Sequence, residues 1–146
     1  TSMIESSMMI NDRMPEYCVD RAAEILNMDQ KAISGSKILI LGVAYKQDID
    51  DYRESPALKV IECFKNRGAQ IDYYDPFIPK YRYKGENYNG LAEISPEKVR
   101  SYDLIMITTA HTSVNYSMVI ENAKWVFDTK NVTKEIKGPK ENVILL

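Results

Sequence analysis

The chain has 146 residues, and 19 Lys+Arg against 21 Asp+Glu give a formal net charge of −2. This length fits one ordinary domain with a sizeable core, and it is too short for a complete two-domain enzyme. The near-neutral charge lacks the basic excess of nucleic-acid-binding proteins, and an apolar content of 45% argues against a disordered chain.

The sequence predicts neither a membrane span nor a signal peptide. No apolar run approaches ~18 residues, so no membrane span is expected. The start, Thr1-Ser2-Met3-Ile4, lacks a basic segment followed by an apolar run and predicts no signal peptide. Two cysteines make no disulfide framework and favour a reducing, cytoplasmic location.

Residues 1–34 are expected to form an N-terminal tail and a connecting helix. Asp12 and then Pro15 give a helix-start signal, and apolar residues recur at helical spacing from there to Leu26. Residues 1–10 show no clear period. Ser34-Gly35-Ser36 predicts a short flexible joint before the next domain.

Residues 35–146 are expected to form an α/β domain. Continuous apolar runs suit buried strands, and they alternate with amphipathic stretches that open with Ser-Pro, at Ser55 and again at Ser95. The expected strands are Ile38–Ala44, Gln70–Tyr74, Leu104–Thr109, Trp125–Phe127 and Val143–Leu146. Residues 76–94 show no period. The alternation predicts a Rossmann-like three-layer sandwich with a mostly parallel sheet, whose ligands bind beyond the carboxyl ends of the strands.

The loop after the first strand is the most informative segment. A dinucleotide cradle would need Gly-x-Gly-x-x-Gly there, and only Gly42 is present. Lys46 and Arg53 supply cations at the ligand edge, and they suit a phosphate. The neighbouring aspartates have two other readings: caps for backbone N–H groups with one paired to Arg53, or a carboxylate metal site built from Asp48, Asp50 and Asp51.

The same loop carries a family resemblance. Ile40 to Leu58 reads Ile-Leu-Gly-Val-Ala-Tyr-Lys-Gln-Asp-Ile-Asp-Asp-Tyr-Arg-Glu-Ser-Pro-Ala-Leu, which closely resembles the signature of the UDP-glucose/GDP-mannose dehydrogenase family, in its C-terminal UDP-binding domain. The resemblance extends over nearly the whole chain from about Asn11. Tyr45-Lys46, Asp75-Pro76 and Thr109-Ala110-His111 are most similar to the branch that acts on UDP-N-acetylhexosamines.

The resemblance implies an oxidoreductase that uses NAD to oxidise the C6 hydroxyl of a UDP-sugar to a carboxylate, for polysaccharide precursor synthesis. It assigns Tyr45, Lys46 and Lys130 to the substrate and Arg53 to the cofactor. Lys130 replaces a common arginine, so it keeps the charge but loses the bidentate fork. NAD and the catalytic cysteine would belong to a preceding N-terminal domain, in a homodimer. This chain alone would hold no catalytic residue and no metal, and would be inactive.

Other conspicuous residues receive structural readings. Cys18 and Cys63 lie on predicted helices and are expected to fill the core. His111 follows the third strand. A capping or lining role at the helix start expected at Thr112-Ser113 is favoured over general acid–base chemistry. The tyrosines around residues 73–88 suit either base stacking or exposed contacts with a partner. A stand-alone flavodoxin-like nucleotide-binding or regulatory module remains an alternative.

Overall fold

A five-stranded parallel sheet forms the centre of the computed structural model, which describes the backbone of residues 2–146 and the side chains of residues 14–146. The strand order is β2-β1-β5-β6-β7, and a separate two-stranded ribbon pairs β3 with β4. In chain order the elements are α1 (Ser2–Met28), β1 (Lys37–Leu41), α2 (Pro56–Asn66), β2 (Gln70–Tyr74), β3 (Lys80–Tyr83), β4 (Glu86–Asn89), α3 (Pro96–Arg100), β5 (Leu104–Ile107), α4 (Tyr116–Asn122), β6 (Val126–Asp128), the 3-10 turn η1 (Val132–Glu135) and β7 (Val143–Leu145).

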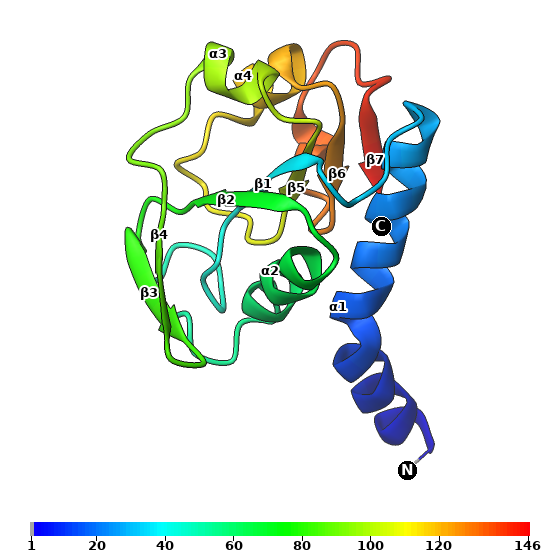
Figure 1. Ribbon diagram of the computed structural model, residues 1–146, viewed down its shortest axis with the longest axis vertical. Helices are drawn as coiled ribbons and strands as arrows, with labels where there is room; N and C mark the ends of the chain where they lie inside the picture. The colour runs from blue at the N-terminus through cyan, green and yellow to red at the C-terminus, as the bar shows by residue number, and fades with distance from the viewer. Residues whose placement is uncertain (1) are drawn as a thin grey trace.

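Helices cover both faces of this sheet. Because side chains alternate along a strand, Ile38 and Ile40 of β1 enter one core, and Leu39 and Leu41 enter the other. The first core is closed by α1 and α2, which pack against each other, and the second by α3 and α4 (Figure 1). The expected three-layer sandwich with a parallel sheet is confirmed.

Local signals explain where the shorter helices begin. Ser55 accepts a hydrogen bond from the Ala57 N–H at the start of α2, and Ser95 accepts one from the Lys98 N–H at the start of α3. Both helices have proline as their first residue, as the sequence indicated. No helix among residues 2–146 is long and apolar enough to cross a membrane.

The N-terminal segment differs from the expectation. Helix α1 begins at Ser2, so Pro15 lies inside the helix instead of opening it. A proline is favourable at a helix start but is tolerated inside at the loss of one backbone hydrogen bond, so the signal was ambiguous. The part of the predicted tail that falls on Thr1 lies outside the described residues. The N-terminal end of α1 projects beyond the rest of the chain (Figure 1).

The predicted flexible joint at residues 34–36 is instead a packed turn. The Gly35 N–H donates to the Gly68 carbonyl at 2.9 Å, and Ser36 is buried. Residues on α1 from Cys18 to Leu26 share a core with Ile38 of β1. Helix and sheet are therefore joined by continuous packing, and the division of the chain at residue 34 stays a prediction.

The stretch expected to be irregular, residues 76–94, contains the β3–β4 hairpin. Its two-residue turn places Lys84 at φ 49° and Gly85 at φ 81°, the pair of positive values that a type I′ turn requires. Tyr81 is buried, stacked on Tyr88 and close to Tyr73, which is also buried. The expectation that these tyrosines are exposed is wrong for Tyr73 and Tyr81, which fill the core.

Candidate functional site

The carboxyl ends of all five parallel strands lie at one edge of the sheet. The chain starts at β1, moves outward to β2, and then crosses over to β5 on the other side of β1. In open α/β sheets this reversal of strand order marks the ligand crevice. The loops after β1 and β5 flank that position, and the loops after β2 and β6 extend it.

The backbone after β1 binds an internal anion. The Asp75 carboxylate, at the end of β2, accepts the N–H of Val43 at 2.8 Å and of Ala44 at 3.2 Å. Gly42, at φ 94°, begins this loop, and a Cβ there would lie 2.4 Å from the Cβ of Thr109 in the loop after β5. Asp75 thus satisfies donors that a phosphate would take in a dinucleotide-binding fold. This loop does not fit the pyrophosphate of NAD.

His111 joins three loops at the same place. Its ring is fully buried, its Nε2 lies 2.8 Å from Asp75 Oδ2, and its Nδ1 accepts the Asp48 N–H at 2.8 Å. The Asp48 carboxylate in turn accepts the Thr112 N–H and hydroxyl. Of the two roles predicted for His111, capping is wrong, because α4 begins at Tyr116 and its cap is Asn115, whereas the lining role stays a prediction.

Asp75 is held as a carboxylate. Burial acts to raise its pKa, but the hydrogen bonds from His111 and from the N–H groups of Val43 and Phe77 outweigh burial and hold the pKa below its ordinary value. The Phe77 ring lies 5.0 Å from the His111 ring and covers it. The buried Asp75 carboxylate therefore accepts four hydrogen bonds and joins the loops at this edge of the sheet.

Tyr45 and Lys46 lie on the exposed part of the loop after β1. The Tyr45 side chain is 49% exposed, and the Lys46 ammonium sits 5.8 Å from the centroid of its ring. The Tyr45 N–H donates to the Asp51 carbonyl at 2.7 Å, which closes the loop on itself. Both predicted substrate residues therefore face solvent at the carboxyl edge.

Arg53 lies on another side of the same loop. Its guanidinium makes a bidentate pair with Asp51, with Nε 3.1 Å and Nη2 3.2 Å from the two carboxylate oxygens, and this hydrogen bonding lowers the pKa of Asp51. The side chain is 83% exposed and borders a hollow of about 620 Å³ that Pro15, Arg82 and Lys84 also line. The pairing of Arg53 with a neighbouring aspartate matches the capping interpretation of the acidic loop.

Lys130 follows β6 at the same sheet edge. Asp128, fully buried, accepts the N–H of Lys130 at 3.0 Å and both the N–H and the hydroxyl of Thr133, and Asn131 adopts a left-handed conformation. This fixed turn presents Lys130 to solvent. Burial raises the pKa of the Cys18 thiol on α1, and the Lys130 charge partly offsets the effect.

The three predicted cations lie at different points of the structure. Lys46 sits beside the Tyr45 ring, Arg53 pairs with Asp51 just before α2, and Lys130 follows β6. The ends of β1 and β6 are separated by β5 alone, roughly 10 Å at the usual strand spacing. A ligand the size of a diphosphate sugar could span the ends of these strands.

The acidic loop does not assemble a metal centre. The Asp48 carboxylate accepts hydrogen bonds from Thr112 and Asp51 pairs with Arg53, so these two carboxylates have separate protein partners. Across the described side chains, no group of three His, Cys, Asp or Glu residues is placed to hold a metal ion.

The cysteines lie mid-helix, as expected. Cys18 is buried in the core beneath α1, and Cys63 of α2 is half-buried against the same core. Burial raises the pKa of both thiols, which keeps them protonated and poorly nucleophilic.

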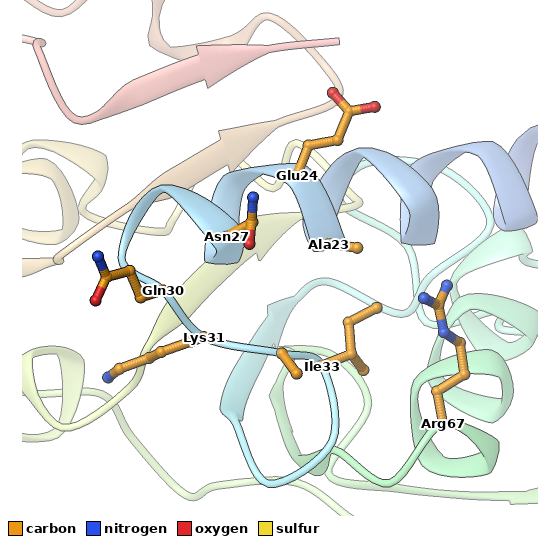
Figure 2. A pocket seen from close by; sticks show the side chains of 8 residues that line it. Ala23, Glu24, Asn27, Gln30, Lys31, Ile33 and Arg67 are labelled. Carbon is orange, nitrogen blue, oxygen red and sulfur yellow. The ribbon is translucent and has the colours of Figure 1, made fainter.

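A large open groove lies at the opposite, amino edge of the sheet. It measures about 650 Å³ and runs between the end of α1, the turn that follows and Arg67 at the end of α2. Figure 2 shows Lys31 and Arg67 at its two ends. Both cations are paired, Lys31 with Asp103 and Arg67 with Asp20, so neither is directed into the groove as a free charge.

The sequence analysis did not predict that Asp75 and His111 form a pair. The signal available was the position of each residue directly after a strand. Their partnership joins residues 36 positions apart, and no local pattern encodes such a contact.

Comparison with known proteins gives consistent results. The model of the UDP-glucose/GDP-mannose dehydrogenase family, UDP binding domain, matches residues 39–135. UDP-N-acetyl-D-mannosamine dehydrogenase of Pyrococcus horikoshii is 31% identical over 91% of this chain and 31% of its own length. UDP-glucose 6-dehydrogenase of Rickettsia bellii is 30% identical over 92% of this chain and 32% of its own length.

Solved structures give the same result. The structure of the Pyrococcus horikoshii UDP-D-ManNAc dehydrogenase superposes with a TM-score of 0.75 at 29% identity, over 99% of this chain and 33% of that one. The chain thus spans about a third of the length of the relatives it matches. Because the family model matches most of the sequence, from Leu39 in β1 to Glu135 at the end of η1, this chain belongs to the UDP-glucose/GDP-mannose dehydrogenase family.

Proposed function

We propose that this chain is the UDP-sugar-binding part of an NAD-dependent UDP-sugar 6-dehydrogenase, an oxidoreductase that converts the sugar C6 hydroxyl into a carboxylate. The observation that carries the proposal is the family match across residues 39–135, whose matching domain is described as UDP binding. The relatives named above, which act on UDP-N-acetylmannosamine and UDP-glucose by name, support a UDP-sugar substrate.

The substrate would lie on the carboxyl edge of the sheet. Lys46 and Lys130 offer ammonium groups for a pyrophosphate, and Tyr45 offers an exposed ring beside Lys46. Buried hydrogen bonds fix the two loops that carry these cations. The Asp75–His111 pair lies beneath the loop after β1, and the Asp128–Thr133 pair fixes the loop after β6. Rigid presentation reduces the ordering that binding would otherwise require.

NAD would be bound mainly by an N-terminal domain of the same full-length protein, with Arg53 facing it across the domain interface. When bound there, NAD accepts hydride from the sugar carbon. The loop after β1 supports this division, since Asp75 already occupies its backbone donors. Arg53, held by Asp51 and exposed, is the one group of this loop that we assign to the cofactor side.

The remaining parts of the proposal concern the whole protein. The catalytic cysteine would be supplied by the N-terminal domain, because Cys18 and Cys63 are both shielded within helices. We further propose a homodimer in the cytoplasm, whose product enters polysaccharide precursor synthesis. The free state of both cysteines is compatible with a reducing compartment.

Calorimetric titration of the 146-residue chain tests the binding assignment. We expect heat on addition of UDP or a UDP-sugar, and Lys46→Ala should weaken binding about 10- to 100-fold, as loss of a hydrogen bond to a charged group does. Lys98→Ala is the matched control, because Lys98 is equally exposed but lies on α3, which leads into the amino end of β5.

Two outcomes would contradict the proposal. Heat with NAD alone and none with UDP would reverse the roles of Lys46 and Arg53. NAD reduction by this chain in the presence of a UDP-sugar would place the catalytic apparatus within these 146 residues.

A further inference from the structure

The segment that carries Tyr45 and Lys46 has few ties to the body of the protein. Residues 45–50 are all exposed, and the Tyr45 hydrogen bond to Asp51 lies within the loop itself. The middle of the segment is fixed through Asp48, whose N–H reaches the buried His111 ring and whose carboxylate reaches Thr112. The position of Lys46, two residues away, therefore depends on what holds Asp48.

The protonation state of His111 follows from its partners. Nδ1 accepts the Asp48 N–H at 2.8 Å, so it must present a lone pair. The ring proton is then on Nε2, which donates to the Asp75 carboxylate at 2.8 Å. A neutral Nε2–H imidazole is the form that satisfies both neighbours.

The charged and titratable groups around the ring come from several elements. Asp75 follows β2, the Asp48 carboxylate lies 3.8 Å from Nδ1 on the loop after β1, and Tyr116 of α4 donates its hydroxyl to the His111 carbonyl at 2.8 Å. Both the His111 and the Asp75 side chains are fully buried. Water therefore has no access to the contact between these two side chains, whereas the Asp48 end of the network is only part-buried.

We propose that His111 is a positioning residue for UDP-sugar binding: its neutral ring connects the buried Asp75 anion to the Asp48 N–H and thereby sets where Tyr45 and Lys46 meet the ligand. This inference rests on the proposed function for its ligand, but the positioning itself is a property of the free chain. It gives His111 no contact with the substrate and no proton transfer in the reaction.

Nitrogen NMR of the wild-type imidazole is the first test. We expect an unprotonated Nδ1 and a protonated Nε2 at neutral pH. A proton on Nδ1 would overturn the proposal, because that ring could not accept from Asp48. This measurement needs neither a variant nor a ligand.

The second test compares His111→Leu with His111→Gln. Leucine fills the space but offers neither hydrogen bond, whereas the glutamine amide carries an acceptor and a donor side by side. We expect His111→Leu to raise amide hydrogen exchange across residues 45–50 and to weaken UDP binding, each by about tenfold, the factor that one hydrogen bond represents. His111→Gln should restore both to within about threefold of wild type.

Thr112→Ala is the matched control, because it removes the hydroxyl that Asp48 accepts but leaves the ring and the Thr112 N–H in place. Its effect on Lys46 exchange and on UDP affinity should be smaller than that of His111→Leu. Equal effects, or unchanged exchange in His111→Leu, would refute positioning by the ring.

The readouts separate this inference from the proposed function. If wild type binds no UDP and His111→Leu still frees residues 45–50, the function fails and the loop assignment holds. If His111→Leu binds UDP as tightly as wild type, positioning is refuted and the function holds. If His111→Leu does not fold, the tautomer of the wild-type ring and the properties of His111→Gln test the proposal instead. A folded His111→Gln protein that does not bind UDP would contradict it.

Discussion

Gly42 is the first residue after β1 and begins the loop that carries Tyr45 and Lys46. Its φ of 94° lies in the region that favours glycine. A Cβ at this position would lie only 2.4 Å from the Cβ of Thr109, so a larger residue would clash with that side chain. The close approach lets the Thr109 hydroxyl donate to the Ala44 carbonyl at 2.9 Å. Glycine at this position therefore serves both a backbone conformation and a contact between two loops.

Gly42→Ala should lower the free energy of unfolding by more than Gly138→Ala does. Gly138 has a similar φ of 105° but open space around it, so it isolates backbone strain of about 1–3 kcal/mol. Gly42→Ala adds overpacking against Thr109, about 1–3 kcal/mol more. Urea denaturation of both variants measures the difference, and equal losses would mean that Thr109 moves aside without cost.

Asp75 connects stability to pH. Because its pKa in the folded chain is lowered, ionised Asp75 stabilises the fold at pH values above its unfolded pKa of about 3.9. That stabilisation is lost as the pH falls through the lower, folded pKa. The window therefore lies on the acid side of about pH 4.

Asp75→Asn should reduce the free energy of unfolding at pH 7 by about 1–3 kcal/mol, because an amide cannot accept all four donors. The difference from wild type should shrink as the pH approaches 2. Urea midpoints across this range check the prediction. Asp50→Asn, at an exposed position in the neighbouring loop, should stay within about 0.5 kcal/mol of wild type throughout. A difference for Asp75→Asn that does not change with pH would contradict the account.

At the scale of elements, the β3–β4 hairpin docks on the body through aromatic packing. The ring centroids of Tyr81 and Tyr88 lie 4.8 Å apart and nearly parallel, and Tyr81 also meets Tyr73 and Tyr52. Burial raises the pKa of Tyr73 to about 12, consistent with a hydroxyl that stays protonated and donates to the Ile78 carbonyl. The Tyr81 hydroxyl is buried with no hydrogen-bond partner among the described residues.

These two tyrosines should respond in opposite directions to loss of the hydroxyl. Tyr81→Phe removes a buried group without a protein partner and should raise the free energy of unfolding by about 1 kcal/mol or more. Tyr73→Phe breaks the hydrogen bond to Ile78 and should lower it by about 1 kcal/mol. Chemical denaturation of the two variants measures both free energies of unfolding. A loss of stability in both would contradict the prediction and would show that the Tyr81 hydroxyl has a hydrogen-bond partner.

Elements with local signals could be predicted from the sequence. The Ser55 and Ser95 caps mark their helices, and apolar runs mark β1, β5, β6 and β7 of the sheet. The hairpin could not, because its turn uses Lys84 at φ 49°, where Asn or Gly would be the usual signal. The continuation of α1 through Pro15 was missed since proline marks a helix start more often than an interior.

Only part of the candidate site could be predicted, because local signals reveal single residues but not contacts between distant ones. Lys46 and Lys130 come soon after strands, so topology alone places them near the carboxyl edge of the sheet, whereas Arg53 lies further along, just before α2. The pairing of His111 with Asp48 spans 63 positions and depends on strand order, which no local pattern encodes.

At the scale of the whole molecule, the chain combines a ligand edge with a helix that belongs to the same core. Residues on α1 pack against α2 and beneath the sheet, and the N-terminal end of α1 leads away from the body (Figure 1). The carboxyl edge carries Tyr45 and Lys46, and the open groove between Lys31 and Arg67 lies at the other edge. The proposed UDP-sugar site and this groove therefore lie in two separate regions of the chain.

A titration of the labelled 146-residue chain with UDP, followed by amide NMR, tests the central claim most directly. The account predicts that UDP shifts the amides of Tyr45 and Lys46 and of the loops after β5 and β6, and leaves those of Lys31 and Arg67 unchanged. Shifts confined to the groove between Lys31 and Arg67, or no shifts at saturating UDP, would contradict the assignment of the carboxyl edge as the UDP-sugar site.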